Sequence, residues 1–438
     1  MMDDIGKMPV SAETDVLVVG GGPSGTAAAL AAARNGADTL LIEQFNCMGG
    51  VATAGGHGYI AKYDEPGTGR RIVGGIAHEI GNRIADSGFG IRDSNGASFE
   101  VEGLKLILER MAEESAVSFL YHTFFCDTLV ENGSVTGAVI QNKSGRQVIK
   151  ARRVIDCTGD GDAGFHAGCP CETGRPSDKR CQPVTLMFTI GGVDWEKTSK
   201  WRKNYQMAEA WEKAQKNGDM RAFQKNIMGW WWTPTRPDFV GVNFTHIIHV
   251  DSTSAEDLTK ATVEGRKQAY ETIEVYRKYV PGMEKCYMVS TPNTVGIRES
   301  RRVMGDYVLT EEDIKAQREF EDNICYGCFF IDIHHIDGPG MDSTVWRPGN
   351  GFKYHIPYRV LLPKGAENIL IAGRCVSCTH IALGSVRVMV QCMGMGEAAG
   401  TAAALSLEKN VTPRQLSVPG LQDRMRAAEC IISEEDIV

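Results

Sequence analysis

The chain has 438 residues, of which 42% are hydrophobic and 23% charged, as in a water-soluble globular protein of roughly two or three domains. Its formal net charge of -8 and the lack of a basic stripe argue against nucleic acid as a partner. The acidic N-terminal segment lacks the order of a secretory signal, and the longest apolar runs are too short to span a bilayer. We therefore expect a cytoplasmic protein that binds neither nucleic acid nor membrane.

The most informative stretch is DVLVVGGGPSGTAAALAAARNGADTLLIEQ, residues 15–44. Residues 15–19 are apolar and β-branched, which predicts a strand buried in a parallel sheet. Residues 25–35 are good helix formers, and the glycine at position 36 is suited to the end of a helix. The turn between strand and helix satisfies G-x-G-x-x-G, with its glycines at Gly20, Gly22 and Gly25.

Each glycine of this turn has a physical task in binding a dinucleotide. The first permits the tight turn, the second lets the backbone approach a pyrophosphate, and the third lets helix and strand pack closely. The N-terminus of the following helix offers free N–H groups and a positive dipole to the phosphates. Glu43 ends the next predicted strand, 18 residues after Gly25, where its carboxylate can accept hydrogen bonds from an adenosine ribose. The sequence therefore predicts a dinucleotide-binding unit, and not a glycine-rich loop that only turns the chain.

The rest of the N-terminal part alternates between predicted helices and strands. A second glycine-dense segment, 49–58, implies backbone that lies close to a flat or charged group. Helices with a period near 3.6 are predicted in GGIAHEIGNRIADSG and GLKLILERMAEESA. Residues 118–154 have the pattern of short strands with turns at ENGS and NKSGR, which predicts a β-meander.

The middle of the chain differs from both ends. It holds most of the tryptophans, amphipathic patterns around 195–216 and 254–280, and several strand-like runs, which favour a mixed sheet with helices on one side. Near the C-terminus an apolar strand, NILIAGR, precedes a glycine- and alanine-rich helix that is predicted to start at about Gly394. We therefore predict a nucleotide-binding domain assembled from residues 1–180 and 354–438, with residues 181–353 inserted as a cap.

Four stretches resemble the FAD-dependent oxidoreductase family, and together they cover almost the whole chain. They are VVGGGPSGTAAALAAARNGADTLLIE, IDCTGDGDAGFHAG, GIRESRRVMGDYVLTEEDI and IPYRVLLPKGAENILIAGRCVSCTHIALGSVRVMVQCMGMGEAAGTAAAL. This family of mixed chemistry has many bacterial members and is related to the flavoproteins of fumarate reductase and succinate dehydrogenase and to the flavin subunit of heterodisulfide reductase. The resemblance implies an α/β fold with a Rossmann-like, glutathione-reductase-like FAD-binding domain, built from a parallel sheet and a β-meander. It also implies an inserted mixed α+β cap.

The resemblance further implies which residues bind FAD, and it places them near both ends of the chain. They are Gly20, Gly22, Pro23, Ser24, Gly25, Glu43, Gln44, Gly49, Gly50, Cys126, Thr158, Gly159, Asp160, Gly373, Arg374, Gly394 and Gly396. Within this set, Cys126 would contact adenine through its backbone, and Gly394 to Gly396 would direct N–H groups toward the flavin O2. Arg374 stands where many relatives have an acid that binds a ribitol hydroxyl. Relatives with covalent flavin carry a histidine at the position of Gly49, so the resemblance implies non-covalent FAD.

The chemistry needs a side chain that exchanges a proton with the substrate while hydride passes between carbon and flavin N5. His380, in CTHIALGSVRV, is our first candidate for this group, and a histidine that only bonds a loop carbonyl is the alternative. His57, in AGGHGY, is a second candidate at the flavin edge. Tyr354 and His355 lead from the cap to the FAD-binding domain, and we expect them to line the mouth of the site.

Arginines supply candidate substrate anchors. Arg298, Arg301 and Arg302 in GIRESRR can bind a carboxylate or a polarised oxygen through paired N–H groups. The alternative for at least one of them is a surface or interdomain salt bridge with Glu299 or Asp306. Arg387 has the same two alternatives, a substrate or a buried ion pair.

Histidine and cysteine groups suggest metal or thiol chemistry, but their spacing favours simpler roles. Adjacent histidines of a strand, as in IDIHHID, point to opposite faces, so we predict no metal. The cysteines do not form the tight run that ligates an iron–sulfur cluster, and buried thiols are expected. They are grouped as Cys169, Cys171 and Cys181, as Cys325 and Cys328, and as Cys375 and Cys378. A redox dithiol at the last pair, which would make a disulfide reductase, is the alternative.

We expect a flavoenzyme that moves hydride between FAD and a small polar organic substrate, most simply by oxidising a CH–OH or CH–NH centre. Reduction of an activated C=C, as in fumarate reductase relatives, is one alternative. An electron-transfer subunit that works with a partner through its cysteine groups is another. A second nicotinamide-binding glycine motif is missing from the middle of the chain, so direct use of NAD(P)H is not supported. The sequence leaves open the electron acceptor or donor and whether the chain forms a homo-oligomer.

Overall fold

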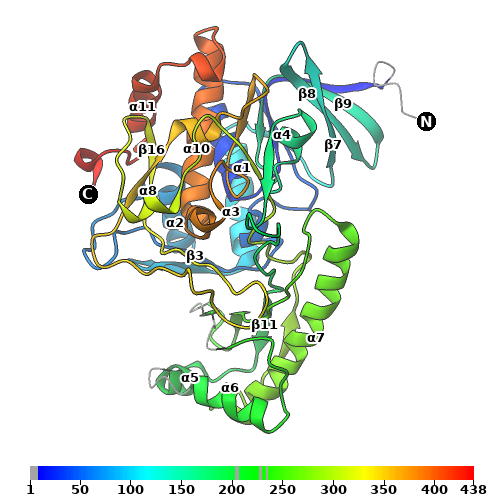
Figure 1. Ribbon diagram of the computed structural model, residues 1–438, viewed down its shortest axis with the longest axis vertical. Coiled ribbons are helices and arrows are strands. Elements are labelled where there is room, and N and C mark those ends of the chain that lie inside the picture. The colour runs from blue at the N-terminus through cyan, green and yellow to red at the C-terminus, as the bar shows by residue number, and fades with distance from the viewer. Residues whose placement is uncertain (1–7, 203–206, 226–228, 233–234) are drawn as a thin grey trace.

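A seven-stranded sheet forms the centre of the computed structural model, which describes residues 8–202, 207–225, 229–232 and 235–438 (Figure 1). Its strands are β1 (Val10–Val19), β2 (Thr39–Ile42), β6 (Ser118–Leu120), β7 (Phe124–Glu131), β8 (Ser134–Asn142), β9 (Gly145–Asp156) and β18 (Ile369–Ile371). Their order is β6-β2-β1-β9-β8-β7, with β18 paired to the end of β9. Strands β6, β2, β1, β9 and β18 pair in parallel, whereas β7, β8 and β9 form an antiparallel meander. The predicted parallel sheet with its meander is therefore confirmed.

Two helices rich in small residues, α1 (Pro23–Arg34) and α10 (Met389–Glu408), lie side by side at the centre of the molecule (Figure 1). Their backbones approach so closely that only glycine fits at the contact. A Cβ atom at Gly396 would overlap the carbonyl oxygen of Ser24, and one at Gly400 would overlap that of Ala28. Segments from near the two ends of the chain thus meet in one interface.

A Gly400→Val substitution should lower the free energy of unfolding by about 3 kcal/mol, because the two helices must separate to admit the side chain. Denaturation by urea measures this change. Gly420→Ala is the matched control, since Gly420 also lies in a helix, α11 (Val418–Ala427), but a Cβ there meets its nearest atom at 3.7 Å. The control should keep or slightly raise the stability. Wild-type stability of Gly400→Val would contradict the close packing.

Further helices and a small sheet surround the central sheet. They are α2 (Gly75–Asp86), α3 (Val101–Glu114), α4 (Asp162–His166), η2 (Gly50–Ala52), and the antiparallel strands β3 (Tyr59–Ala61), β4 (Gly90–Asp93) and β5 (Gly96–Phe99). The helices predicted in GGIAHEIGNRIADSG and GLKLILERMAEESA are confirmed as α2 and α3. In α2, Ile76, Ile80 and Ile84 recur at helical spacing and are all buried, which explains why this segment folds as a helix against the core.

A second sheet with three helices forms the lower part of the molecule in Figure 1. It contains β11 (Phe188–Gly191), β12 (Gly229–Trp231), β13 (Val240–Asn243), β14 (Tyr287–Ser290), α5 (Trp195–Arg202), α6 (Met207–Lys216) and α7 (Ala255–Tyr279). The predicted mixed sheet is wrong, because every pair in it is antiparallel. The chain passes from β13 through α7 to β14 on the other side of β11, so β13 and β14 run in the same direction although each pairs antiparallel with β11. The predicted amphipathic segment 195–216 is two helices, and residues 203–206 between them lie outside the described residues.

The chain beyond β14 pairs with segments on either side of the predicted cap. Strand β15 (Arg301–Val303) pairs with β10 (Cys171–Thr173), and β16 (Asn323–Gly327) pairs with β17 (Tyr354–Pro357). The remaining elements are α8 (Glu311–Lys315), α9 (His380–Val386), η3 (Tyr358–Leu361), η4 (Pro413–Gln415) and η5 (Glu434–Asp436). The domain boundaries at residues 180 and 354 stay a prediction.

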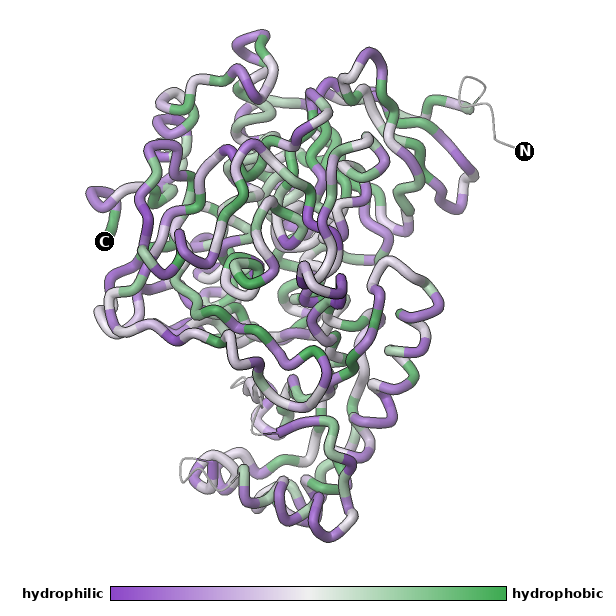
Figure 2. Tube along the Cα trace, viewed as in Figure 1, coloured by the Kyte–Doolittle hydropathy of each residue, from purple (hydrophilic) through white to green (hydrophobic). Residues whose placement is uncertain are grey.

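Hydrophobic segments gather in the interior of the part of the molecule that is built around the seven-stranded sheet. Hydrophilic segments are frequent along its outer loops and along α6 and α7 (Figure 2). The largest core cluster contains buried residues of β1, α1, α2, α3 and α10. Across the described residues, no helix combines the length and the apolar character that crossing a bilayer requires.

Candidate functional site

Segments that the sequence predicts to bind FAD converge on the N-terminus of α1. The glycine turn after β1 places Gly20 at φ +95°, against the loop that follows β9. Gly50 lies against Gly22, and Gly373 lies against the hydroxyl group of Ser24. The structure thus gathers segments that are far apart in the sequence around one helix end.

The space in front of this helix end fits a pyrophosphate. A Cβ atom at Gly22 would meet no protein atom within 4 Å, and no side chain caps the start of α1. Gly25 has the opposite surroundings, because a Cβ there would overlap the carbonyl oxygen of Gly20. Gly22 therefore leaves an open approach for an anion, whereas Gly25 lets α1 pack against β1.

Glu43 follows β2 directly, and its carboxylate lies across the glycine turn. Its Oε2 accepts a hydrogen bond from the Gly21 N–H at 2.7 Å, and its Oε1 accepts one from the Phe45 N–H at 2.9 Å. The residue is 6% exposed, and this burial raises the pKa of Glu43. The neighbouring Gln44 is exposed. This place at the carboxyl ends of β1 and β2 suits a ribose-binding acid, and that role stays a prediction.

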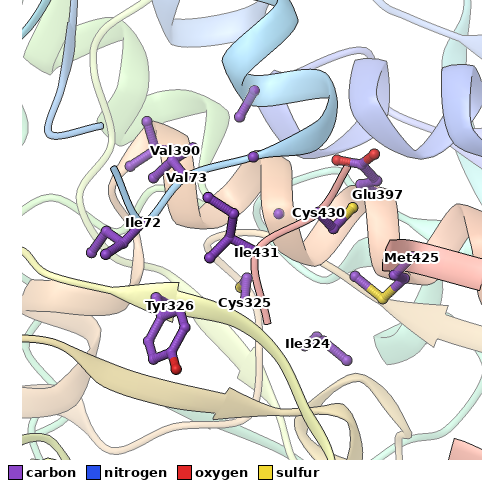
Figure 3. A pocket seen from close by; sticks show the side chains of 13 residues that line it. Ile72, Val73, Ile324, Cys325, Tyr326, Val390, Glu397, Met425, Cys430 and Ile431 are labelled. Carbon is purple, nitrogen blue, oxygen red and sulfur yellow. The ribbon is translucent and has the colours of Figure 1, made fainter. Parts of the chain in front are cut away.

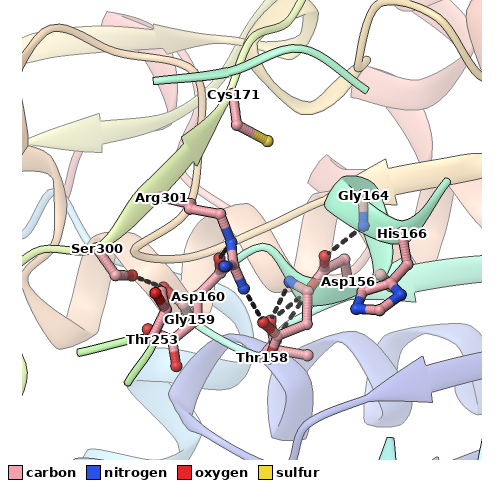
Figure 4. A network of polar contacts seen from close by, with 12 residues as sticks. Asp156, Thr158, Gly159, Asp160, Gly164, His166, Cys171, Thr253, Ser300 and Arg301 are labelled. Carbon is pink, nitrogen blue, oxygen red and sulfur yellow. Dashed lines mark hydrogen bonds and ion pairs between the residues drawn. The ribbon is translucent and has the colours of Figure 1, made fainter. Parts of the chain in front are cut away.

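The second predicted cofactor element forms a polar network after β9 (Figure 4). The buried carboxylate of Asp156 accepts two backbone N–H groups, one of them from Thr158, at 2.9 and 3.0 Å. Arg374 Nη2 lies 2.9 Å from Asp160 Oδ1, and Gly159 packs against the same guanidinium group. Arg374 therefore joins the loop after β18 to the loop after β9, a role that the sequence did not indicate.

One predicted cofactor contact is wrong. Helix α10 begins at Met389 with Val388 as its N-cap, so Gly394 and Gly396 lie inside the helix. Their N–H groups are used by the helix itself and cannot reach the flavin O2, and Gly396 serves the contact with α1 instead. Cys126 lies in β7 next to an irregularity in the pairing with β8, and its contact with adenine stays a prediction.

His380 begins α9, and a buried carboxylate holds its ring. Nδ1 of His380 lies 2.9 Å from Oε1 of Glu299, which is 0% exposed. Glu299 also accepts hydrogen bonds from Arg302 and from the Gln182 N–H, the latter at 3.0 Å. The salt-bridge alternative for one arginine of GIRESRR is thus confirmed for Arg302. Because Glu299 accepts from Nδ1, the basic nitrogen of the neutral ring is Nε2.

Arg298 and Arg387 lie in the same polar interior as Asp332. Arg298 is 8% exposed, and its Nη1 donates to the Pro183 carbonyl at 2.8 Å and to the Thr185 hydroxyl at 2.6 Å. Arg387 Nη2 donates to the Asp332 carbonyl at 3.0 Å and lies 3.4 Å from the Asp332 carboxylate. Burial and the nearby charge of Arg387 lower the pKa of Arg298 to about 9. The interior therefore holds two cations beside one carboxylate.

The other two predicted catalytic residues differ in their surroundings. His57 stacks on Trp231 with ring centroids 4.9 Å apart, and burial lowers the pKa of His57 to about 4, which keeps the ring neutral. Tyr354 is 1% exposed, and its hydroxyl lies 2.7 Å from Oγ of Ser385. The prediction that Tyr354 lines the mouth of the site is wrong, because β17 carries this side chain into the core. The neighbouring His355 is partly buried and accepts a backbone N–H at 2.9 Å.

In the part of the chain that is described, no group of three or more His, Cys, Asp or Glu side chains is arranged to hold a metal ion. His334 faces Asp332, whereas His335 accepts a backbone N–H, so the adjacent histidines use different partners. All thirteen cysteines are free thiols. Burial raises the pKa of Cys378 to about 12 and that of Cys375 well above its usual value. These values oppose the thiolate that a redox dithiol requires.

A small pocket beside α10 contains a further buried carboxylate (Figure 3). Apolar side chains such as Ile72 and Ile431 line most of it, and Glu397 and Cys430 lie on one wall. Glu397 Oε2 accepts the Ile76 N–H at 2.9 Å. Burial raises the pKa of Glu397 to about 7. Met425, Cys430 and Ile431 of the C-terminal segment also line the pocket, so we expect ionisation of Glu397 to affect the stability of the fold.

Replacing Glu397 by glutamine should stabilise the protein at about pH 8 by about 2 kcal/mol and have little effect at about pH 4. The folded state keeps a proton on Glu397 up to a pKa of about 7, whereas the usual value is 4.5. The protein therefore loses stability as the pH rises from the usual pKa to the raised one, and glutamine, which cannot ionise, removes this loss. Urea denaturation of both proteins at about pH 4 and about pH 8 measures the difference in the free energy of unfolding. Glu408→Gln, at an exposed position of the same helix, should show no such pH-dependent gain.

The parallel sheet, the open glycine turn and the acid after β2 define a dinucleotide-binding flavoprotein fold. The sequence profile of the family described as FAD dependent oxidoreductase matches residues 15–425, and the chain belongs to this family. The residues around the N-terminus of α1 fit the FAD for which this family is named.

Curated relatives match only part of the chain. Digeranylgeranylglycerophospholipid reductase 2 of Methanopyrus kandleri is 31% identical over 205 residues, which are 42% of this chain and 46% of that protein. Thiamine thiazole synthase of Methanococcus vannielii is 30% identical over 159 residues, which are 34% of this chain and 56% of that protein. The chain thus spans about half the length of these relatives. A solved geranylgeranyl bacteriochlorophyll reductase-like protein from Thermoplasma acidophilum covers 97% of this chain and 85% of its own, with 15% identity and a TM-score of 0.47.

Proposed function

We propose that this enzyme holds FAD non-covalently and oxidises a CH–OH or CH–NH centre of a small polar substrate. The observation that carries the proposal is the buried pair of His380 and Glu299, which are 2.9 Å apart. His380 lies seven residues after Gly373, in the segment that contacts Ser24 at the FAD-binding helix end. A proton acceptor is therefore available in the segment that follows the proposed FAD-binding loop.

The residues around His380 suit proton transfer at its Nε2. When bound, FAD supplies the hydride acceptor. His380 would take the proton from the substrate oxygen or nitrogen as the neighbouring carbon is oxidised. Glu299 fixes the ring in the required tautomer and stabilises the positive charge that the ring gains. Arg302 and the Gln182 N–H supply hydrogen bonds that a fully buried carboxylate needs.

Anaerobic mixing of the FAD-loaded protein with hydroxy acids, sugars, amines and enoates tests this function through bleaching of the flavin band. We expect at least one alcohol or amine to bleach the flavin. If none does and an enoate reoxidises chemically reduced flavin, the enzyme reduces an activated C=C instead. Iron and acid-labile sulfide in the purified protein would favour an electron-transfer subunit.

A further inference from the structure

Buried polar atoms without a hydrogen-bond partner gather around Arg387. In the described part of the chain they include Arg387 Nε, Gln182 Nε2, His334 Nδ1 and His246 Nδ1. Three of these residues, Gln182, His246 and His334, are at most 4% exposed. Buried polar atoms of native proteins are nearly always paired, so unpaired atoms in one place indicate a missing partner.

Short contacts join these residues into one cluster. Arg387 Nη2 lies 3.5 Å from Gln182 Oε1 and 3.4 Å from Asp332 Oδ2. The same Asp332 oxygen lies 3.5 Å from His334 Nε2, and the rings of His334 and His246 are 6.0 Å apart. Gln182 also contacts Glu299, the residue that holds the proposed proton acceptor His380, because the backbone N–H of Gln182 donates to Glu299. The cluster is therefore continuous with the pair of His380 and Glu299.

The cluster offers both donors and acceptors. Arg387 Nε and the amide nitrogen of Gln182 can only donate. His246 Nε2 faces the carbonyl oxygens of Gly338 and His335 at 2.9 and 3.2 Å, so it carries the proton and leaves Nδ1 as an acceptor. His334 Nε2 faces the Asp332 carboxylate, which leaves its Nδ1 as an acceptor as well. The missing partner must therefore accept at one end and donate at another.

The charges of the cluster favour an anion. Arg298 and Arg387 are cationic, and Asp332 is the carboxylate between them. Although burial raises it, the hydrogen bond from His334 and the arginine charges hold the pKa of Asp332 below its usual value. Burial lowers the pKa of both His246 and His334 to about 4, so neither ring adds charge near neutral pH. One positive charge is left over in a buried place, where an unpaired charge is costly.

We propose that the substrate is a hydroxy or amino carboxylate, whose carboxylate accepts from Arg387 and Gln182 and whose hydroxyl or amino group donates to a histidine of the cluster. The inference rests on the proposed function, because the same compound would be the hydride donor. It narrows that function from small polar substrates in general to acids with a donor group close to the carboxylate.

Equilibrium binding to the FAD-loaded protein tests the inference without turnover. The probes are 2-hydroxyisobutyrate and 2-aminoisobutyrate, which lack the C–H that oxidation removes, and their amides, in which an uncharged carboxamide replaces the carboxylate. We expect saturable perturbation of the flavin spectrum by at least one acid and roughly 100-fold weaker binding of its amide. Arg387→Met should weaken binding of the acid by a similar factor, and Arg387→Lys should restore part of it. Arg221→Met, at an arginine that pairs with Glu264 and Glu271 on α7, is the matched control.

Melting temperature and FAD content show whether each variant is folded. Equal binding of acid and amide, unchanged binding in a folded Arg387→Met variant, or no saturable binding of either acid would overturn the inference. The proposed function fails separately. If a neutral alcohol bleaches the flavin while neither acid binds, the oxidation stands and the carboxylate site does not. If an acid binds but no alcohol or amine bleaches the flavin, the carboxylate site stands and the proposed oxidation does not.

Discussion

A Gly22→Val variant should fold normally and yet be purified without FAD. The backbone of Gly22 has φ -65°, which valine adopts, and no protein atom lies within 4 Å of the added Cβ. The side chain therefore fits the protein but occupies the approach to the N-terminus of α1, where the pyrophosphate needs close backbone contact. We expect FAD affinity to fall by at least about 100-fold, equivalent to about 2.7 kcal/mol. The ratio of flavin to protein absorbance and titration with added FAD measure this loss.

Two further glycine variants make the result specific. Gly349→Val also adds a side chain where no atom lies within 4 Å, and it should keep its FAD. Gly25→Val should fail to fold, because its side chain would overlap the Gly20 carbonyl. The melting temperature of Gly22→Val should equal that of wild-type protein stripped of FAD. A yellow Gly22→Val protein with wild-type occupancy would show that the pyrophosphate lies elsewhere.

A His380→Asn variant should bind FAD as the wild type does and lose about 100- to 10,000-fold in the rate of flavin reduction by substrate. Asparagine keeps an amide donor that can satisfy Glu299, so the buried carboxylate is not left without this partner. The expected loss comes from the missing proton acceptor alone. Stopped-flow mixing with the reducing substrate found by the bleaching assay measures the rate.

A second histidine variant shows whether the loss is specific to His380. His355→Asn, at a histidine whose ring accepts a backbone N–H away from Glu299, is the matched control and should keep the wild-type rate. A His380→Asn rate within a few-fold of the wild type would assign proton transfer to another group, with His57 as the next candidate.

Local signals explain what the sequence could predict. The glycine turn, α1 and Glu43 follow one another within residues 15–44, and each has a chemical pattern of its own. The meander and α7 were predictable for the same reason, because period and turn residues are local properties. The start of α10 was missed by five residues, from Gly394 to Met389, since the apolar run before Gly394 carries no capping signal.

Long-range contacts explain what the sequence could not predict. Glu299 is 81 residues from His380 and 117 from Gln182, yet it bonds to both. No local pattern marks a carboxylate that will be fully buried by such contacts. The same holds for Tyr354, whose burial follows from the pairing of β17 with β16 and from its bond to Ser385. Asp332 and His334 stand in a motif that suggested metal ligands, and only the fold places them beside Arg387.

The stoichiometry and release of flavin test whether segments from both ends of the chain form one binding site for a single FAD. The purified protein, incubated with excess FAD and desalted, is measured by absorbance before and after acid denaturation. We predict one FAD per chain, and we expect acid denaturation to release all of it from the polypeptide. A colourless protein that takes up no flavin would contradict the site around α1, and flavin retained by the denatured polypeptide would contradict non-covalent binding.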